Sequence, residues 1–403
     1  MVDVSRLFTP EFHANPHPVY HEIRAEGPLL ALTVPGLESW LATGYEVVSS
    51  ILRDARFRSG FPRDAAQGED AEWAARSPTT FHTFQRMMLL NHGADHARLR
   101  GLVSRAFTPR MVEKLRPRIE KLVDELLDGV AARGEIDLLR DFAFPLPVTV
   151  IAELFGIPAE DSERLKRWSV PLAQILDGMT RSSKLLEAEQ AALEMQDYLR
   201  KQFERHRARP GEGLIDGLLA ARDQGDRLSE DELFAACMLL LLAGHETTTN
   251  LIGNGVLALL RQRREWERLC RDPELAPGAV EECLRYEGPV QFTSRRPVGD
   301  VEVLGRPIPD EQEVLLVLAA ANRDPARFPD PDRLDITRRD DAHLAFGHGA
   351  HFCLGASLAR LEATIAFRAL ARRFPKLELA TDELTWRPGF AIRALVSLPA
   401  RLA

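Results

Sequence analysis

Apolar side chains recur along the chain at spacings of three to four positions, and this pattern dominates from about residue 95 to residue 286. Such a spacing places apolar groups on one face of an α-helix. The clearest such face consists of Leu115, Ile119, Leu122, Leu126 and Val130. The pattern therefore predicts a chain that is mainly α-helical.

Shorter apolar runs bounded by turn residues indicate smaller β regions. The segments 37–41, 301–303 and 314–318 are of this kind, and glycine or proline lies between the last two. Residues 45–52 follow a Thr-Gly turn and complete the N-terminal region. By contrast, residues 60–94 are polar with few periodic positions, so we expect a long loop of the type that covers binding sites.

The most apolar stretch, from Leu233 to Gly244, holds twelve residues without a charge. A bilayer span takes roughly 20 residues, so a buried helix is predicted instead. The first residues show no apolar segment typical of a signal peptide. Apolar content of 45% and charge of 28% suit a soluble globular protein, and we expect a cytoplasmic location without membrane attachment.

Net charge of −8 argues against nucleic-acid binding. Between residues 98 and 121, however, eight basic residues accompany only two acidic ones. Such a run is either an ordinary solvated helix face or a docking surface for an acidic partner protein.

The apolar helix ends in polar residues that include three consecutive threonines, residues 247–249. The Thr247 hydroxyl can bond back to the carbonyl of Ala243 and bend the helix, and Gly244 leaves room beside that turn. Taken alone, this is most simply a packing helix with a polar end. A zinc motif beginning at His245 lacks its second histidine, because Thr249 stands there.

Cys353 follows a glycine-rich loop and precedes a segment that reads as a helix from Leu354 to about Phe367. Helix N-termini favour the thiolate. The four cysteines form no CxxC pair, so zinc and iron–sulfur sites lack their usual spacing. A buried structural cysteine and a catalytic cysteine with a histidine base stay open. A thiolate, three glycines that let backbone approach a flat partner, and the donor His351 together describe a haem iron held by cysteine.

The motif Phe346-Gly347-x-Gly349-x-His351-x-Cys353-x-Gly355 resembles the haem-binding signature of the cytochrome P450 family. The segments 321–325 and 358–362 resemble its soluble bacterial branch. The resemblance covers nearly the whole chain. It implies one domain over residues 1–403 with the cytochrome P450 fold: a large helical part, smaller β-sheet regions, and haem b (iron protoporphyrin IX) buried between two helices with Cys353 on the iron.

The same resemblance implies roles for other residues. Thr247 is expected to hydrogen-bond dioxygen and Glu246 to gate protons toward it. Glu282 and Arg285 match a structural ExxR motif, with Arg333 as the expected third member. The residues expected to contact haem are His96, Arg100, Ala243, Gly244, Arg295, Phe346, Gly347, His351, Cys353 and Gly355, with Arg296 as an alternative to Arg295.

The resemblance implies a monooxygenase that inserts one oxygen atom of O2 into a hydrophobic small molecule, as in secondary metabolism. Electrons would come from a separate ferredoxin-type donor, and the protein is expected to be a monomer. The pocket residues we expect are Phe84, Met87, Leu89, Leu240, Ala243, Phe292, Thr293, Phe390 and Ala391. A peroxide-driven peroxygenase, a non-catalytic haem-thiolate protein and a cysteine hydrolase are the alternatives.

Overall fold

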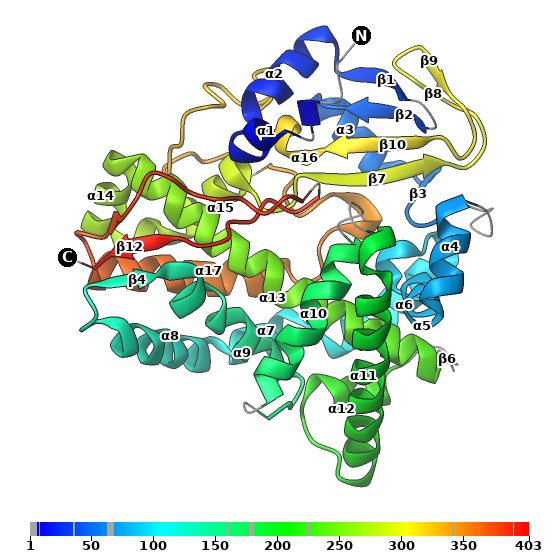
Figure 1. Ribbon diagram of the computed structural model, residues 1–403, viewed down its shortest axis with the longest axis horizontal. Helices are drawn as coiled ribbons and strands as arrows, with labels where there is room; N and C mark the ends of the chain where they lie inside the picture. The colour runs from blue at the N-terminus through cyan, green and yellow to red at the C-terminus, as the bar shows by residue number, and fades with distance from the viewer. Residues whose placement is uncertain are drawn as a thin grey trace. The chain divides into compact units, whose positions relative to one another are not determined.

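A computed structural model shows a helix-rich chain with small sheets (Figure 1). It describes residues 6–7, 9–34, 37–62, 68–158, 161–176, 181–223, 226–340, 342–389 and 391–402. The chain divides into two compact units. Unit 1 comprises Met1–Phe57, Glu113–Pro147 and Glu246–Ala403, and unit 2 comprises Arg58–Val112 and Val148–His245.

The helices of unit 1 are α1 (Pro10–Ala14), α2 (His17–Glu26), α3 (Tyr45–Arg53), α8 (Arg116–Val130), η3 (Leu139–Ala143), α14 (Arg263–Arg271), η5 (Pro273–Leu275), α15 (Ala276–Glu287), α16 (Leu318–Ala321), η6 (Gly349–His351) and α17 (Ala356–Arg373). Its strands are β1 (Leu29–Val34), β2 (Leu37–Ala42), β4 (Glu135–Asp137), β7 (Phe292–Pro297), β8 (Val301–Val303), β9 (Arg306–Ile308), β10 (Glu313–Val317), β11 (Glu378–Leu379) and β12 (Pro399–Arg401).

Unit 2 contains α4 (Gly68–Arg76), α5 (Pro78–Gln85), η2 (Met88–Leu90), α6 (Gly93–Ala106), α10 (Ser162–Leu176), α11 (Arg181–Ala208), α12 (Leu214–Ala220), β5 (Arg222–Asp223) and β6 (Asp226–Arg227). Four elements have residues in both units: β3 (Phe57–Arg58), α7 (Pro109–Lys114), α9 (Pro145–Leu154) and α13 (Glu230–Arg261).

The main sheet has the strand order β1-β2-β10-β7-β3, with β2 and β10 parallel and the pairs β1–β2 and β10–β7 antiparallel. Alternate residues of β10 enter different cores, because side chains of a strand alternate between faces. Val314 and Leu316 pack into a core that includes Val48 of α3. Leu315 and Val317 belong to a core that includes Tyr20 of α2. The sheet is therefore covered on both faces.

The predicted helices and strands are largely confirmed, but the loop expected over residues 60–94 is wrong. That segment contains α4, α5 and η2. Pro78 stands in the first turn of α5, where a missing N–H costs nothing, while its N-cap Ser77 makes no side-chain capping bond. Glu189 of α11 accepts hydrogen bonds from the backbone N–H groups of Thr79 and Thr80, both at 3.0 Å. A cap from a distant helix leaves no local sequence signal.

Glu311 lies in the turn between β9 and β10. Its φ is +63°, in the left-handed region that costs an L-residue about 1–2 kcal/mol. The carbonyl of Glu311 accepts a hydrogen bond from Arg296 at 3.0 Å, which helps to hold this turn. The turn is thus formed without a glycine at this position.

Candidate active site

Cys353 lies between η6 and α17, and α17 begins at Ala356, two residues after the predicted start at Leu354. Backbone bonds shape this loop: the N–H of Cys353 donates to the carbonyl of Phe346 at 2.9 Å, and that of Gly347 to Leu344 at 2.8 Å. Cys353 is half-buried, so its sulfur can meet a ligand. Cys237 and Cys283 are fully buried, and burial raises the pKa of both thiols.

Close approach to a flat partner is not the only role of the glycines in this loop. Gly347 and Gly349 have φ values of +70° and +68°, which other residues rarely adopt. A Cβ on Gly349 would also lie 2.5 Å from the carbonyl oxygen of Leu52 in α3. A Cβ on Gly355 would lie 3.9 Å from the Cys353 sulfur, an ordinary van der Waals contact. Two of the three glycines are thus required by the shape of the loop.

One face of α13 is accessible to solvent, although the rest of this part of the helix is largely buried. Leu240, Gly244 and Thr247 are half-buried and Ala243 is exposed, whereas residues 241 and 242 are buried. The spacing of these four positions is that of a single helix face. On another side of the same turn, a Cβ on Gly244 would lie 2.9 Å from Ile151, so this glycine permits close packing with α9. The open stripe is where a broad group can lie against α13.

Glu246 is half-buried on α13, and its Oε1 accepts a hydrogen bond from Arg387 Nη2 at 2.7 Å. Arg387 belongs to the C-terminal segment and carries no recognisable motif, so sequence reasoning did not find it. Two glycines further along α13, Gly253 and Gly255, serve helix packing. Cβ atoms there would lie 2.3 Å from Leu139 and 2.5 Å from Phe367.

Arg295 on β7 is a buried cation that forms no ion pair with any described carboxylate. It bonds the Ser294 carbonyl at 2.7 Å and Thr293 Oγ1 at 3.3 Å. Desolvation by burial lowers its pKa to about 10. Buried charges are normally paired, so this guanidinium fits a ligand that brings a carboxylate. Arg296 instead pairs with Glu313 at 3.2 Å, which favours Arg295 over its neighbour.

The ExxR pair on α15 is fully buried, and Arg285 donates to both oxygens of Glu282 at 2.7 Å. The prediction that the Arg333 side chain is the third member is wrong. Arg333 contacts Arg285 only through its carbonyl oxygen, which accepts a hydrogen bond from Arg285 at 3.1 Å. Arg338 supplies the side chain instead, with Nε 3.2 Å from Glu282 Oε2. Sequence could not choose between two arginines in the same segment.

The remaining predicted residues lie on several elements. In unit 2, His96 and Arg100 are one turn apart on α6, and His96 is buried. Phe84 and Met87 are buried near the end of α5, while Leu89 is 41% exposed. In unit 1 the set comprises Phe292 and Thr293 on β7, Ala391 in the C-terminal segment, and Phe346 and His351 in the cysteine loop. Phe390 lies outside the described residues.

Three features of the described chain fit haem: an accessible cysteine sulfur in a preformed loop, an open stripe on an apolar helix, and a buried arginine without a carboxylate partner. Haem offers an iron, a flat apolar face and two carboxylates to these features. None of the helices in the described ranges is long and apolar enough to cross a membrane.

Comparison with known proteins agrees with this geometry. The family model of cytochrome P450 matches residues 6–388. Cytochrome P450 107B1 of Saccharopolyspora erythraea is 46% identical over 403 residues, covering 98% of this chain and 96% of that protein.

Two solved structures are similar over nearly the full length. The crystal structure of P450BioI in complex with hexadec-9Z-enoic acid ligated acyl carrier protein has a TM-score of 0.92 and 41% identity, covering 98% of this chain and 99% of that one. The structure of myxobacterial CYP267B1 in complex with myristic acid has a TM-score of 0.90 and 42% identity, covering 99% of both. The chain therefore belongs to the cytochrome P450 family and is a haem-dependent monooxygenase.

Proposed function

We propose that this protein hydroxylates or epoxidises a hydrophobic small molecule with O2, using electrons from a separate ferredoxin-type protein. One oxygen atom enters the substrate, and the other leaves as water after the uptake of two electrons and two protons. The observation that carries the proposal is the open stripe on α13, because it joins apolar positions to the Glu246-Thr247 pair on one helix. The stripe can hold a substrate and a proton relay side by side.

Haem supplies the iron at which dioxygen is activated, and the chain supplies its setting. Cys353 is proposed as the iron ligand; a thiolate pushes electron density to the iron and favours O–O cleavage. Arg295, His351, His96 and Arg100 are proposed to bind the haem carboxylates.

Thr247 Oγ1 is proposed to orient dioxygen by a hydrogen bond. Glu246 is proposed to pass protons to that hydroxyl, since a half-buried carboxylate can exchange protons with solvent. The expected haem contacts of Ala243 and Gly244 belong to the same stripe.

A long-chain fatty acyl group is the substrate class we favour, either as the free acid or on a carrier protein. Two similar structures bind such chains, one as a carrier-protein complex and one as free myristic acid. The expected pocket residues Phe84 and Met87 are buried apolar groups that suit an alkyl chain.

A titration monitored by the spin state of the haem tests this substrate class. Myristic acid and its carrier-protein thioester are expected to shift the visible spectrum, whereas an amphipathic macrolide of similar mass serves as the comparison. A shift with the macrolide alone would contradict the proposed class.

The ferredoxin-type donor is proposed to use the basic residues of 98–121. Several of these are already neutralised locally: Arg98 pairs with Glu232, Arg116 with Glu113, and Arg118 with Glu125. Arg110 and Lys114 on α7 are exposed and form no ion pair within the described residues. Reversing both charges is expected to slow reduction by an acidic ferredoxin at low salt and to change little at high salt. Monomeric state and cytoplasmic location stay predictions.

Two substitutions test the proposal as a whole. Cys353→Ser is expected to abolish the red-shifted carbon-monoxide band of the reduced protein, because oxygen replaces the sulfur ligand. Thr247→Ala is expected to consume electrons and release hydrogen peroxide in place of product. Tightly coupled product formation by the Thr247 variant would show that its role is misassigned. Equal turnover with peroxide and with ferredoxin would favour the peroxygenase alternative.

A further inference from the structure

Residues 385–389 and 391–396 form the two arms of a hairpin near the C-terminus. Its two arms are joined by a β-bridge between Trp386 and Leu395, and the N–H of Arg387 donates to the carbonyl of Ala394 at 2.8 Å. The tip of this hairpin carries Ala391, which is expected to contact substrate. The position of the tip therefore depends on how the two arms are held.

The returning arm is held by a buried charge network. Arg393 is buried, forms an ion pair with Glu287, donates to the carbonyl of His13 at 2.7 Å, and stacks on Trp386 at 3.5 Å from the ring centre. The N–H of Gln291 also donates to the carbonyl of Ala391 at 2.8 Å. This arm cannot move without breaking several buried bonds.

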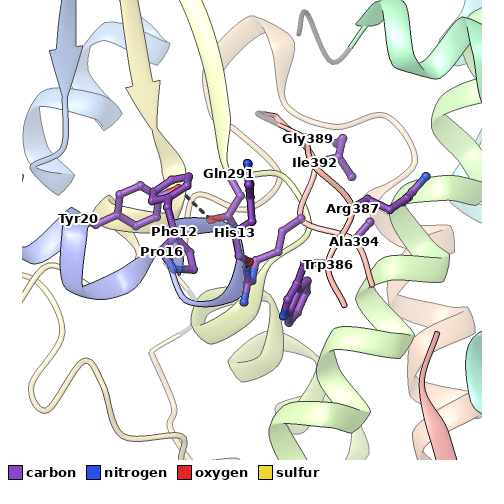
Figure 2. A pocket seen from close by; sticks show the side chains of 11 residues that line it. Phe12, His13, Pro16, Tyr20, Gln291, Trp386, Arg387, Gly389, Ile392 and Ala394 are labelled. Atoms are coloured by element: carbon purple, nitrogen blue, oxygen red, sulfur yellow. Dashed lines mark hydrogen bonds between the residues drawn. The ribbon is translucent and has the colours of Figure 1, made fainter. Parts of the chain in front are cut away.

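The outgoing arm is held differently: the Trp386 ring packs against Arg393, and Arg387 reaches out to α13. Arg387 lines a small pocket that is partly open to solvent, and its guanidinium extends away from Tyr20 (Figure 2). It binds Glu246 Oε1 at 2.7 Å, and its side chain is 41% exposed. Glu246 Oε2 makes no hydrogen bond to any residue that the structure describes.

Both arms end on the same helix. Asn254 Nδ2 of α13 donates to the carbonyl of Arg393 at 3.0 Å, two turns beyond Glu246. Eight residues of helix span about 12 Å. The hairpin is therefore fixed to α13 at a buried point, Asn254, and at the partly exposed ion pair between Arg387 and Glu246, the residue that precedes Thr247.

We propose that Arg387 is a positioning residue that holds the Glu246 carboxylate and couples it to the substrate-facing hairpin. Oε1 is kept in the ion pair, so Oε2 is the atom left to take a proton from solvent and to turn toward Thr247. A substrate that contacts the hairpin tip would displace Arg387. This displacement would change the fraction of time that the Glu246 carboxylate spends in the ion pair. This proposal rests on the proposed function of Glu246.

Arg387→Gln and Arg387→Lys, compared with Arg401→Gln, test the proposal. Arg401 is an exposed arginine on β12 that pairs with Glu378, so its loss leaves the hairpin intact. In Arg387→Gln, product formed per electron pair is expected to fall about three- to tenfold with a larger solvent isotope effect, because proton transfer becomes limiting. Arg387→Lys restores part of the loss. Amide exchange of residues 385–396, measured without turnover, is expected to quicken in Arg387→Gln only.

Peroxide-driven turnover separates proton delivery from substrate placement. Peroxide brings its own protons, so Arg387→Gln is expected to retain wild-type product formation with peroxide. A parallel loss with peroxide and with O2, or unchanged coupling and exchange, would overturn the proposal. If the wild-type protein itself lacks the red-shifted carbon-monoxide band or makes no product, the proposed function fails instead.

Discussion

The contacts that hold the cysteine loop in place differ in kind from those that hold α5. Both regions are nevertheless expected to lie beside the reacting substrate. The thiolate support (α15, α17 and residues 322–338) is tied by buried charges: Arg285 binds Glu282 and the carbonyls of residues 322, 331 and 333. The α5 region (α4, α5 and α11) is tied by aromatic packing, with Trp73 5.3 Å from Phe81 and 5.4 Å from Phe84 between ring centres.

The difference follows from what each region has to do. The metal–sulfur bond proposed for Cys353 would tolerate little movement, and directional bonds to a buried charge fix positions closely. Aromatic contacts tolerate sliding, so the α5 region can adapt to substrates of different shape. Four substitutions break or sharpen this comparison, from the largest expected effect to the smallest.

Arg285→Met leaves Glu282 buried with much of its pairing lost. Removing one partner of a buried pair costs about 3–5 kcal/mol of unfolding free energy. Denaturant unfolding of the haem-loaded protein measures the loss. Arg76→Met, which breaks an exposed 2.7 Å pair with Glu72, is the control and is expected to cost less than about 1 kcal/mol. Equal costs would contradict the importance of the buried network.

His17 sits in the other buried charge cluster of unit 1. Burial, helped by Arg323 and opposed by Glu287, lowers its pKa from 6.5 to about 4. The folded protein resists protonation of His17, so the contribution of neutral His17 to the unfolding free energy is fully present above about pH 6.5. This contribution is lost as the pH falls toward 4. The loss reaches up to about 3 kcal/mol. Unfolding midpoints across this range are expected to fall less steeply in His17→Gln, while His92→Gln, at an exposed site, follows the wild type.

Gly349→Ala tests the loop that carries the cysteine. A positive φ costs about 1–2 kcal/mol, and the new Cβ would also lie 2.5 Å from the Leu52 carbonyl, so the loop must shift away from α3. Gly305→Ala isolates the first effect, because its φ is +73° and no atom lies within 4 Å of its Cβ position. Thermal unfolding compares the two. If they are equally destabilising, contact with α3 does not restrain the loop.

Glu189→Gln weakens the cap of α5 without changing its shape. Losing the charge on bonds to Thr79 and Thr80 is expected to cost about 1 kcal/mol and to speed amide exchange in α5. The carbon-monoxide band should be unchanged, because the cysteine loop is in unit 1. Glu187→Gln, at an exposed residue paired with Lys184, is expected to do neither. A changed band would contradict the independence of the two regions.

Much of the site could be predicted because its chemistry is local in sequence. The cysteine, its glycines and the Glu246-Thr247 pair lie in short motifs, and the buried ExxR pair needs only one helical turn. The periodicity of apolar residues located α8 and α13 for the same reason. Local spacing determines which residues share a face, whatever surrounds them.

The residues that were missed act across long separations. Arg338 reaches Glu282 over 56 positions and Arg387 reaches Glu246 over 141, while α5 is capped by Glu189 from another helix. The sequence by itself determined the family, the helical content and the cysteine loop. Only the tertiary structure decided which arginine meets which carboxylate, because many arginines are chemically equivalent and folding alone selects the one brought within hydrogen-bonding distance.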